Sequence, residues 1–116
     1  MAGATGVTVR VVSNRLPSIS AQIRPLVADE VKRATLDIEA RAKARTPVLT
    51  GTLRRSIASV FENGGLTGRV GPSVGYSRFV EFGTRRMSAR PYMRPAAEAV
   101  LPKFAEAVKR VLRGLK

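Results

Sequence analysis

The sequence has no cysteine, no histidine and no tryptophan among its 116 residues, and these absences exclude several kinds of protein. Without thiols and imidazoles, the usual zinc sites, thiol nucleophiles, Ser–His triads and histidine general bases cannot be built. Without cysteine there is also no disulfide framework of the kind that holds small secreted domains together. We therefore expect no catalytic, cofactor-binding or metal-binding residues.

Acidic residues are also scarce. Eight Asp and Glu stand against 21 Lys and Arg, so the net charge is +13, and the chain is nevertheless 44% apolar, unlike a disordered polybasic tail. Six of the acids fall in predicted helices, mostly three or four residues from a base, as in Asp37–Arg41, and are expected to form surface ion pairs. Glu81 lies in an apolar and basic segment, FVEFGTRR, and is expected to pair with Arg85, Arg86 or Arg90.

Long apolar runs are missing as well. No run reaches the length of a membrane span, and the first residues, MAGATGVTVR, lack the pattern of a signal peptide. A protein made in the cytoplasm, without membrane contact, is the expectation. The strong basicity first indicates a nucleic-acid partner.

The apolar residues that are present predict two long helices. A stripe with a period near 3.6 residues runs from Ile19 to Ala42, which predicts a helix from about Pro25 to Arg45 that stops before Pro47. A second stripe follows Arg94-Pro95 and continues to Leu115, with Pro95 at the first helical position and a kink expected at Pro102.

The remaining segments predict a small sheet. Residues 7–12, VTVRVV, alternate like a strand, and residues 56–71 predict a hairpin around Asn63-Gly64-Gly65, with Ile57 and Val60 in the core. Thr50 or Thr52 is expected to cap a short helical turn through Arg55. Residues 76–82 fit either a helical turn or an edge strand. The prediction is an α+β fold in a single domain over residues 1–116, with the two amphipathic helices covering one face of an antiparallel sheet.

The aromatic residues argue against a nucleic-acid reader. The chain has six, at spacings typical of a core and without an evident stacking platform: Phe61, Tyr76, Phe79, Phe82, Tyr92 and Phe104. The loop of residues 84–95 instead combines arginines with Met and Tyr, a composition favoured at protein interfaces. Its candidate interface residues are Arg85, Arg86, Met87, Arg90, Tyr92, Met93 and Arg94.

Three sequence blocks carry a family resemblance. The first block lies in the segment RTPVLTGTLRRSI. The other two lie after a glycine-rich hairpin, in the segment GYSRFVEFGTRRMSARPYMRPAAE. In these blocks the chain resembles the tail-completion or neck proteins of long-tailed double-stranded DNA phages, which are tail components of the virion. The resemblance covers most of residues 30–112. The residues that carry it as motif or structural positions are Pro47, Thr50, Gly51, Leu53, Ser56, Tyr76, Glu81, Phe82, Gly83, Thr84, Pro91 and Pro95.

The resemblance implies a virion structural protein, not an enzyme, that is assembled in the host cytoplasm. It implies a homo-oligomeric ring at the head–tail junction or the top of the tail, with a hexamer favoured and a dodecamer as the alternative. Neighbouring connector and tail-tube proteins would be the partners, and genomic DNA in the channel would be contacted without sequence preference. In this reading Gly83 takes a positive φ, and Pro91 and Pro95 stiffen the loop. Glu81 anchors the loop or a neighbouring subunit through an arginine.

A second hypothesis stays open beside this one. A small basic protein could bind DNA non-specifically through phosphate contacts, with an affinity that falls steeply with salt.

Overall fold

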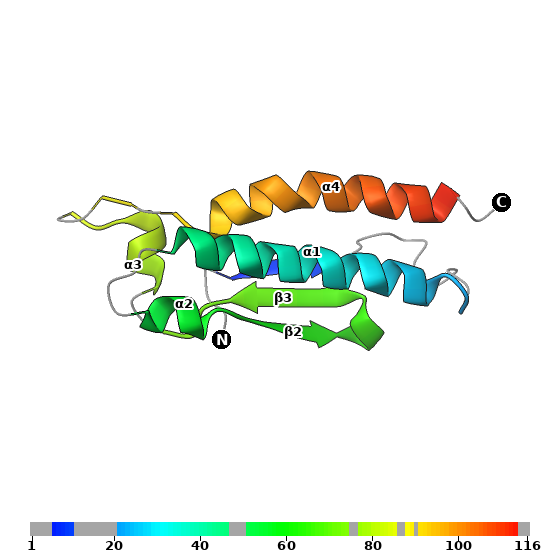
Figure 1. The fold of residues 1–116 in the computed structure, drawn as a ribbon, viewed down its shortest axis with the longest axis horizontal. Helices are drawn as coiled ribbons and strands as arrows, with labels where there is room; N and C mark the ends of the chain where they lie inside the picture. Colours follow the sequence, from blue (N-terminus) through cyan, green and yellow to red (C-terminus); the bar gives the residue numbers. More distant parts are fainter. Residues whose placement is uncertain are drawn as a thin grey trace.

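The computed structural model of the chain describes residues 6–10, 21–46, 51–74, 77–85, 88–89 and 91–113. Their fold is α+β, as predicted, with a three-stranded antiparallel sheet and two long helices (Figure 1). The elements in chain order are β1 (Val7–Arg10), α1 (Arg24–Arg45), α2 (Thr52–Ser56), β2 (Ala58–Glu62), the short 3-10 helix η3 (Asn63–Gly65), β3 (Thr67–Gly71), α3 (Ser77–Phe82) and α4 (Met93–Arg113). No helix within these described ranges is both long and apolar enough to cross a membrane.

The sheet has β3 in the centre, between β1 and β2. Gly68 of β3 lies opposite Val9 of β1 and Phe61 of β2, so these three positions share one face of the sheet. The helices pack on this face, which contributes Val9 and Val70 to the core. The hairpin between β2 and β3 is where the sequence predicted it.

The two long helices lie side by side and run in opposite directions (Figure 1). α1 packs over β3 in the middle of the sheet, while α4 packs against α1 and reaches the edge strand β1. The predicted stripe of α1 is confirmed, because it supplies Val31, Ala34 and Ile38 to the core. α4 contributes Ala96 and Val100 to the same cluster. The molecule is elongated, with extents of 55 × 22 × 22 Å.

A helix approaches the sheet closely at Gly68. A Cβ on this residue would overlap Oγ1 of Thr35 and would lie 3.0 Å from its Cβ, a separation tighter than nine in ten real Cβ contacts. Thr35 is fully buried and its hydroxyl donates to the Val31 carbonyl at 2.7 Å, so it cannot easily turn away. The absence of a side chain at Gly68 is therefore what lets α1 settle onto β3.

Several local predictions need correction. Val60 is 58% exposed and not in the core, because its place opposite Arg69 puts it on the face of the sheet that the helices leave open. The residue that caps α2 is Gly51, at φ +77°, and not Thr52, since no side chain caps this helix; Thr50 lies outside the described residues. α4 begins at Met93, two residues before the predicted start at Pro95.

Other boundaries agree more closely. α1 spans Arg24–Arg45, one residue longer than predicted, and α3 settles the choice at residues 76–82 in favour of a helix from Ser77. The first strand is described over Val7–Arg10, and Val11 and Val12 of the predicted strand lie outside the described residues. Pro102 lies inside α4, and the kink expected there stays a prediction.

Candidate assembly surface

The segment that follows α3 leaves the helix at a glycine. Gly83 has φ +79°, and its N–H donates to the Phe79 carbonyl at 2.8 Å, which closes the last turn. A residue with a Cβ would be strained by about 1–2 kcal/mol in this conformation. The positive φ predicted for Gly83 is therefore confirmed, and it turns the chain out of α3 into residues 83–91, which we call the arm.

The base of the arm is held by one buried carboxylate. Glu81 is 4% exposed. Its Oε1 accepts the backbone N–H groups of Tyr92 at 3.2 Å and Met93 at 2.9 Å, and its Oε2 accepts that of Arg94 at 3.2 Å. The first N–H groups of a helix have no partner within the helix and carry partial positive charge, so a carboxylate suits them well. Glu81 of α3 thus caps the start of α4.

This contact corrects the partner expected for Glu81. The expectation that it anchors the loop fits the geometry, but the groups that it binds in the described structure are backbone amides and not an arginine side chain. Arg94, the nearest described arginine in sequence to these amides, directs its side chain to Glu98 at 3.5 Å. The carboxylate therefore links two helices of one chain.

Tyr92 and Met93 strengthen the same junction from the inside. Tyr92 is completely buried and its hydroxyl donates to the Ser77 carbonyl at 3.2 Å, while Met93 is 2% exposed. Both were predicted as interface contacts, and this is a correction, because their side chains belong to the main hydrophobic core with residues of α1 and the sheet. The composition of the loop predicted that these two side chains contact a partner protein, but they are buried within the chain itself.

The arm itself is exposed where the structure describes it. Thr84, Arg85 and Pro91 are exposed, and the neighbouring Ser88 and Ala89 are as well. The described part of the arm extends beyond α3 at one end of the long axis (Figure 1). Of the other predicted interface residues, Arg94 is exposed on α4, and Arg86, Met87 and Arg90 lie outside the described residues.

Two phenylalanines beside the arm are exposed, which the sequence analysis missed. Phe79 is 43% and Phe82 is 59% exposed, although their spacing was interpreted as that of core residues. A hollow of about 290 Å³ lies next to Phe82, between α3, α4 and the start of β1. Gly6, Val7 and Ala97 are among the residues that line it. Exposed aromatic rings beside arginines are typical of protein interfaces. We call Phe79, Phe82 and the arm the α3–arm surface.

The first sequence block has a structural role. Gly51 turns the chain into α2, and Leu53 is 4% exposed in the core. The Ser56 hydroxyl donates to the Leu53 carbonyl at 2.8 Å and accepts the Ser73 N–H at 3.3 Å, which ties α2 to the segment after β3. Pro47 and Thr50 of this block, and Tyr76 of the next, lie outside the described residues.

Seven of the eight carboxylates make structural contacts. Six of them make ion pairs, as in Asp37–Arg41 at 2.8 Å, and Glu81 caps α4. The pKa of Glu39 is lowered, chiefly by a hydrogen bond from the Ser59 hydroxyl at 2.6 Å. Burial, which has the second-largest effect, raises this pKa, and Lys43 lowers it further. In the described part of the chain, no group of three acidic residues is placed to hold a metal ion.

Comparison with known proteins gives one match. Residues 10–83, more than half of the chain, match the family described as "Bacteriophage HK97-gp10, putative tail-component". No curated protein and no solved structure matches the chain. The matched span includes the blocks at residues 47–56 and 76–83. The predicted resemblance beyond residue 83, which includes most of the arm, stays a prediction.

Proposed function

The chain belongs to the HK97-gp10 family of bacteriophage tail components, and from this premise we propose that it assembles through its α3–arm surface into a ring in the virion. The ring would lie at the head–tail junction or the top of the tail, and a hexamer is favoured over a dodecamer. The observation that carries the proposal is the pairing of two exposed phenylalanines with an arginine-bearing arm on a base fixed by Glu81.

A fixed base matters for assembly because binding loses less entropy when the docking segment is already ordered. Three backbone hydrogen bonds to one carboxylate, and the buried ring of Tyr92, position the start of α4 relative to α3. The two ends of the arm, Gly83 and Pro91, therefore adjoin residues that are held in place. Phe82 and the hollow beside it supply the apolar part of the contact, and Arg85 the charged part.

The contact that forms a ring joins two different surfaces of neighbouring copies. Such a head-to-tail contact closes only when the rotation between copies divides a full turn. A two-fold contact of this surface would bring the arginines of two arms together, whereas a head-to-tail contact lets them meet a different surface of the neighbouring copy. Connector and tail-tube proteins would bind the completed ring, and no catalytic step is part of this function.

Native mass measurement of the purified protein, alone and with connector and tail-tube proteins, tests the proposal. We expect a ring of six copies and its loss, with retained fold, in the variant F79S/F82S. Charge reversal at Arg85, Arg86 and Arg90 is expected to weaken assembly in the same way.

The matched control is L26S/V60S, which removes two exposed apolar side chains from α1 and β2. This variant should still form the ring. A strict monomer that joins no partner, or equal loss of assembly in the control, would overturn the proposal.

A further inference from the structure

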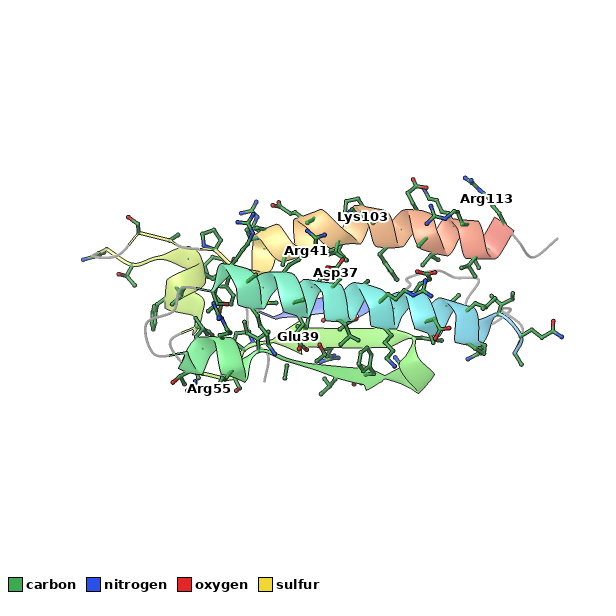
Figure 2. The ribbon with its side chains drawn as sticks, viewed as in Figure 1. Asp37, Glu39, Arg41, Arg55, Lys103 and Arg113 are labelled. Atoms are coloured by element: carbon green, nitrogen blue, oxygen red, sulfur yellow. The ribbon has the colours of Figure 1, made fainter. Side chains whose placement is uncertain are left out.

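The outer side of α4 carries three exposed cations that no acid neutralises. Lys103, Arg110 and Arg113 make no ion pair within the described part of the chain, whereas the other two cations of this helix are paired, Arg94 with Glu98 and Lys109 with Glu106. In Figure 2, Arg113 points away from the body of the molecule at the end of α4. We call Lys103, Arg110 and Arg113 the α4 stripe.

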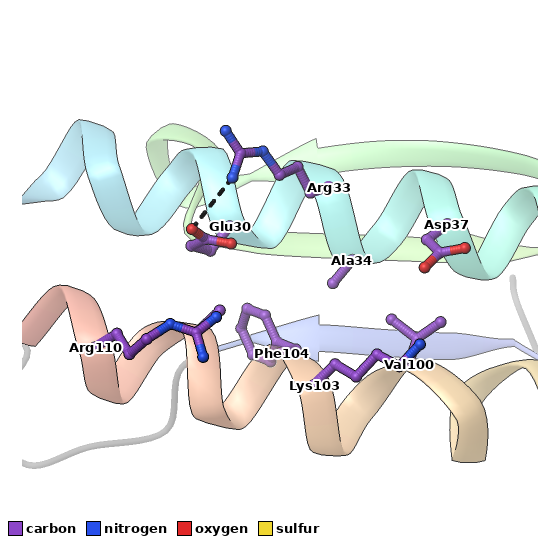
Figure 3. Close-up of a pocket in the computed structure, with 9 residues that line it drawn as sticks. Glu30, Arg33, Ala34, Asp37, Val100, Lys103, Phe104 and Arg110 are labelled. Atoms are coloured by element: carbon purple, nitrogen blue, oxygen red, sulfur yellow. Dashed lines mark hydrogen bonds and ion pairs between the residues drawn. The ribbon is translucent and has the colours of Figure 1, made fainter.

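The α4 stripe is linear. Steps of seven and three residues keep the three side chains on neighbouring parts of the helix surface. With a rise of 1.5 Å per residue, the stripe extends over about 15 Å of the helix. Two of its members, Lys103 and Arg110, line the α4 side of the groove between α4 and α1, a hollow of about 200 Å³ (Figure 3).

The acids on the other border of this groove do not neutralise the stripe. Glu30 of α1 is paired with Arg33 at 3.4 Å (Figure 3), and Asp37 is paired with Arg41 at 2.8 Å. Each acid of this border thus already has a cation on its own helix. The α1 side is close to neutral, and the positive charge of the α4 stripe remains available to an external anion.

The α4 stripe also lacks what a protein interface needs. Interfaces are centred on buried aromatic or aliphatic anchors, with charges at the rim. The exposed large apolar side chains of the described residues are Leu26, Leu36, Val60, Phe61, Phe79 and Phe82, and none of them is on α4. A row of cations without an apolar anchor fits a regular polyanion better than an acidic protein surface. Duplex DNA, with a phosphate charge for every 1.7 Å or so of its axis, is such a polyanion.

We propose that the α4 stripe binds the phosphate backbone of duplex DNA without reading its sequence. The inference does not depend on ring formation, because a single copy carries all three cations. A ring would multiply the contact through many copies held together.

The test measures anisotropy of a short labelled duplex of arbitrary sequence while salt rises from about 50 to about 200 mM. The variant is K103Q/R110Q/R113Q. The matched control, K32Q/R54Q/R55Q, removes the same charge from exposed and unpaired cations of α1 and α2. Arg55 lies on α2, well away from α4 (Figure 2).

The wild-type protein and the control should bind the duplex with the same salt dependence. The α4 variant should reduce the slope of log affinity against log salt by about 3, close to 0.9 for each lost phosphate contact. Its affinity at about 0.1 M salt should fall tenfold or more. The F79S/F82S variant should keep the wild-type slope, which separates DNA binding from assembly.

Three results would overturn the inference. Equal loss in the control would mean that overall charge, and not the α4 stripe, binds DNA. Absence of binding at low salt would exclude the contact. Tighter binding of polyglutamate than of the duplex, lost in the same α4 variant, would assign the stripe to an acidic protein.

Discussion

The centre of the molecule and the junction of α3 with α4 are both buried, but they are held together in opposite ways. In the centre, α1 lies on β3 because Gly68 has no side chain to keep Thr35 away. At the junction, α3 and α4 are joined because Glu81 has a long polar side chain that reaches three backbone amides. One contact depends on shape, and the other on directed hydrogen bonds.

This difference has consequences for how each region responds to change. An added side chain in a closely packed region forces neighbouring atoms to move, and this lowers the stability of the sheet and of the helix packed on it. A hydrogen-bonded cap is local, because its removal leaves orphan N–H groups in one helical turn and disturbs little beyond it. The stability of the core should therefore be sensitive to side-chain volume, and that of the junction between α3 and α4 to polarity.

The largest effect is expected for Gly68→Val. The added side chain would have to displace Thr35, which has no free space, so we expect a loss of about 3 kcal/mol or more of unfolding free energy, or failure to fold. Urea denaturation followed by circular dichroism measures it. The control is Gly64→Ala, at φ +65° with nothing within 4 Å, which should lose only about 1–2 kcal/mol from backbone strain.

A double-mutant cycle sharpens the steric explanation. Gly68→Ala alone should destabilise the protein by about 1–3 kcal/mol, and Thr35→Ala in the same chain should recover part of this loss. The recovery is expected because two of the three atoms of Thr35 nearest to the added Cβ, Oγ1 and Cγ2, are then absent. Additive effects of the two substitutions would contradict a direct clash.

An intermediate effect is expected for Glu81→Gln. The glutamine side chain keeps one oxygen acceptor, but its NH2 group faces backbone N–H groups, which also donate. The hydrogen bonds to the charged carboxylate that are lost contribute about 1.5–3 kcal/mol. We expect a loss of about 2 kcal/mol, with faster hydrogen exchange in the first turn of α4 and unchanged protection in α1. Glu98→Gln, on the exposed side of α4, should change stability by less than about 0.5 kcal/mol. Uniform loss of protection would show that the junction is not a local unit.

The smallest effect is a pH dependence at the contact between α1 and β2. The pKa of Glu39 lies below its ordinary value of 4.5, chiefly because it accepts the Ser59 hydroxyl. A lowered folded-state pKa stabilises the protein above the unfolded pKa, and this stability is lost as the pH falls through the folded value.

Ser59→Ala should therefore destabilise the protein by about 1 kcal/mol at pH 7 and by less as the pH falls below about 4. Urea midpoints at both pH values check this. Ser73→Ala, at an exposed position after β3, should show no such pH dependence. A loss in Ser59→Ala that is the same at both pH values would contradict the link to Glu39.

The sequence predicted the parts of the fold that depend on local periodicity. α1 and the hairpin followed from the spacing of apolar and turn residues, whereas the positive φ of Gly83 was implied by the family resemblance. The burial predicted for Val60 was wrong because the sequence of a strand does not show which of its two faces the helices cover. Gly51 was missed as a cap because a hydroxyl residue stands next to it on both sides.

The candidate site was less predictable because it depends on contacts between distant residues. The acceptor role of Glu81 involves residues 11 to 13 positions further along the chain, and no spacing rule connects an acid to the start of the next helix at that distance. Phe79 and Phe82 were misplaced for a related reason, since their spacing did not show that they are exposed while Tyr92, further along the chain, is buried. Gly68, inside the strand segment LTGRVG, is a signal of close backbone approach. It could have indicated that a helix residue, here Thr35, packs against the strand at this position.

The cap at Glu81 also joins two parts of the chain that are assigned to different contacts. Glu81 lies at the base of the arm, and the helix that it caps carries Lys103, Arg110 and Arg113. Because α4 is fixed at its start by this carboxylate and packs against α1, these cations keep one position relative to the base of the arm. A subunit held by its arm would therefore present all of its α4 cations in one orientation.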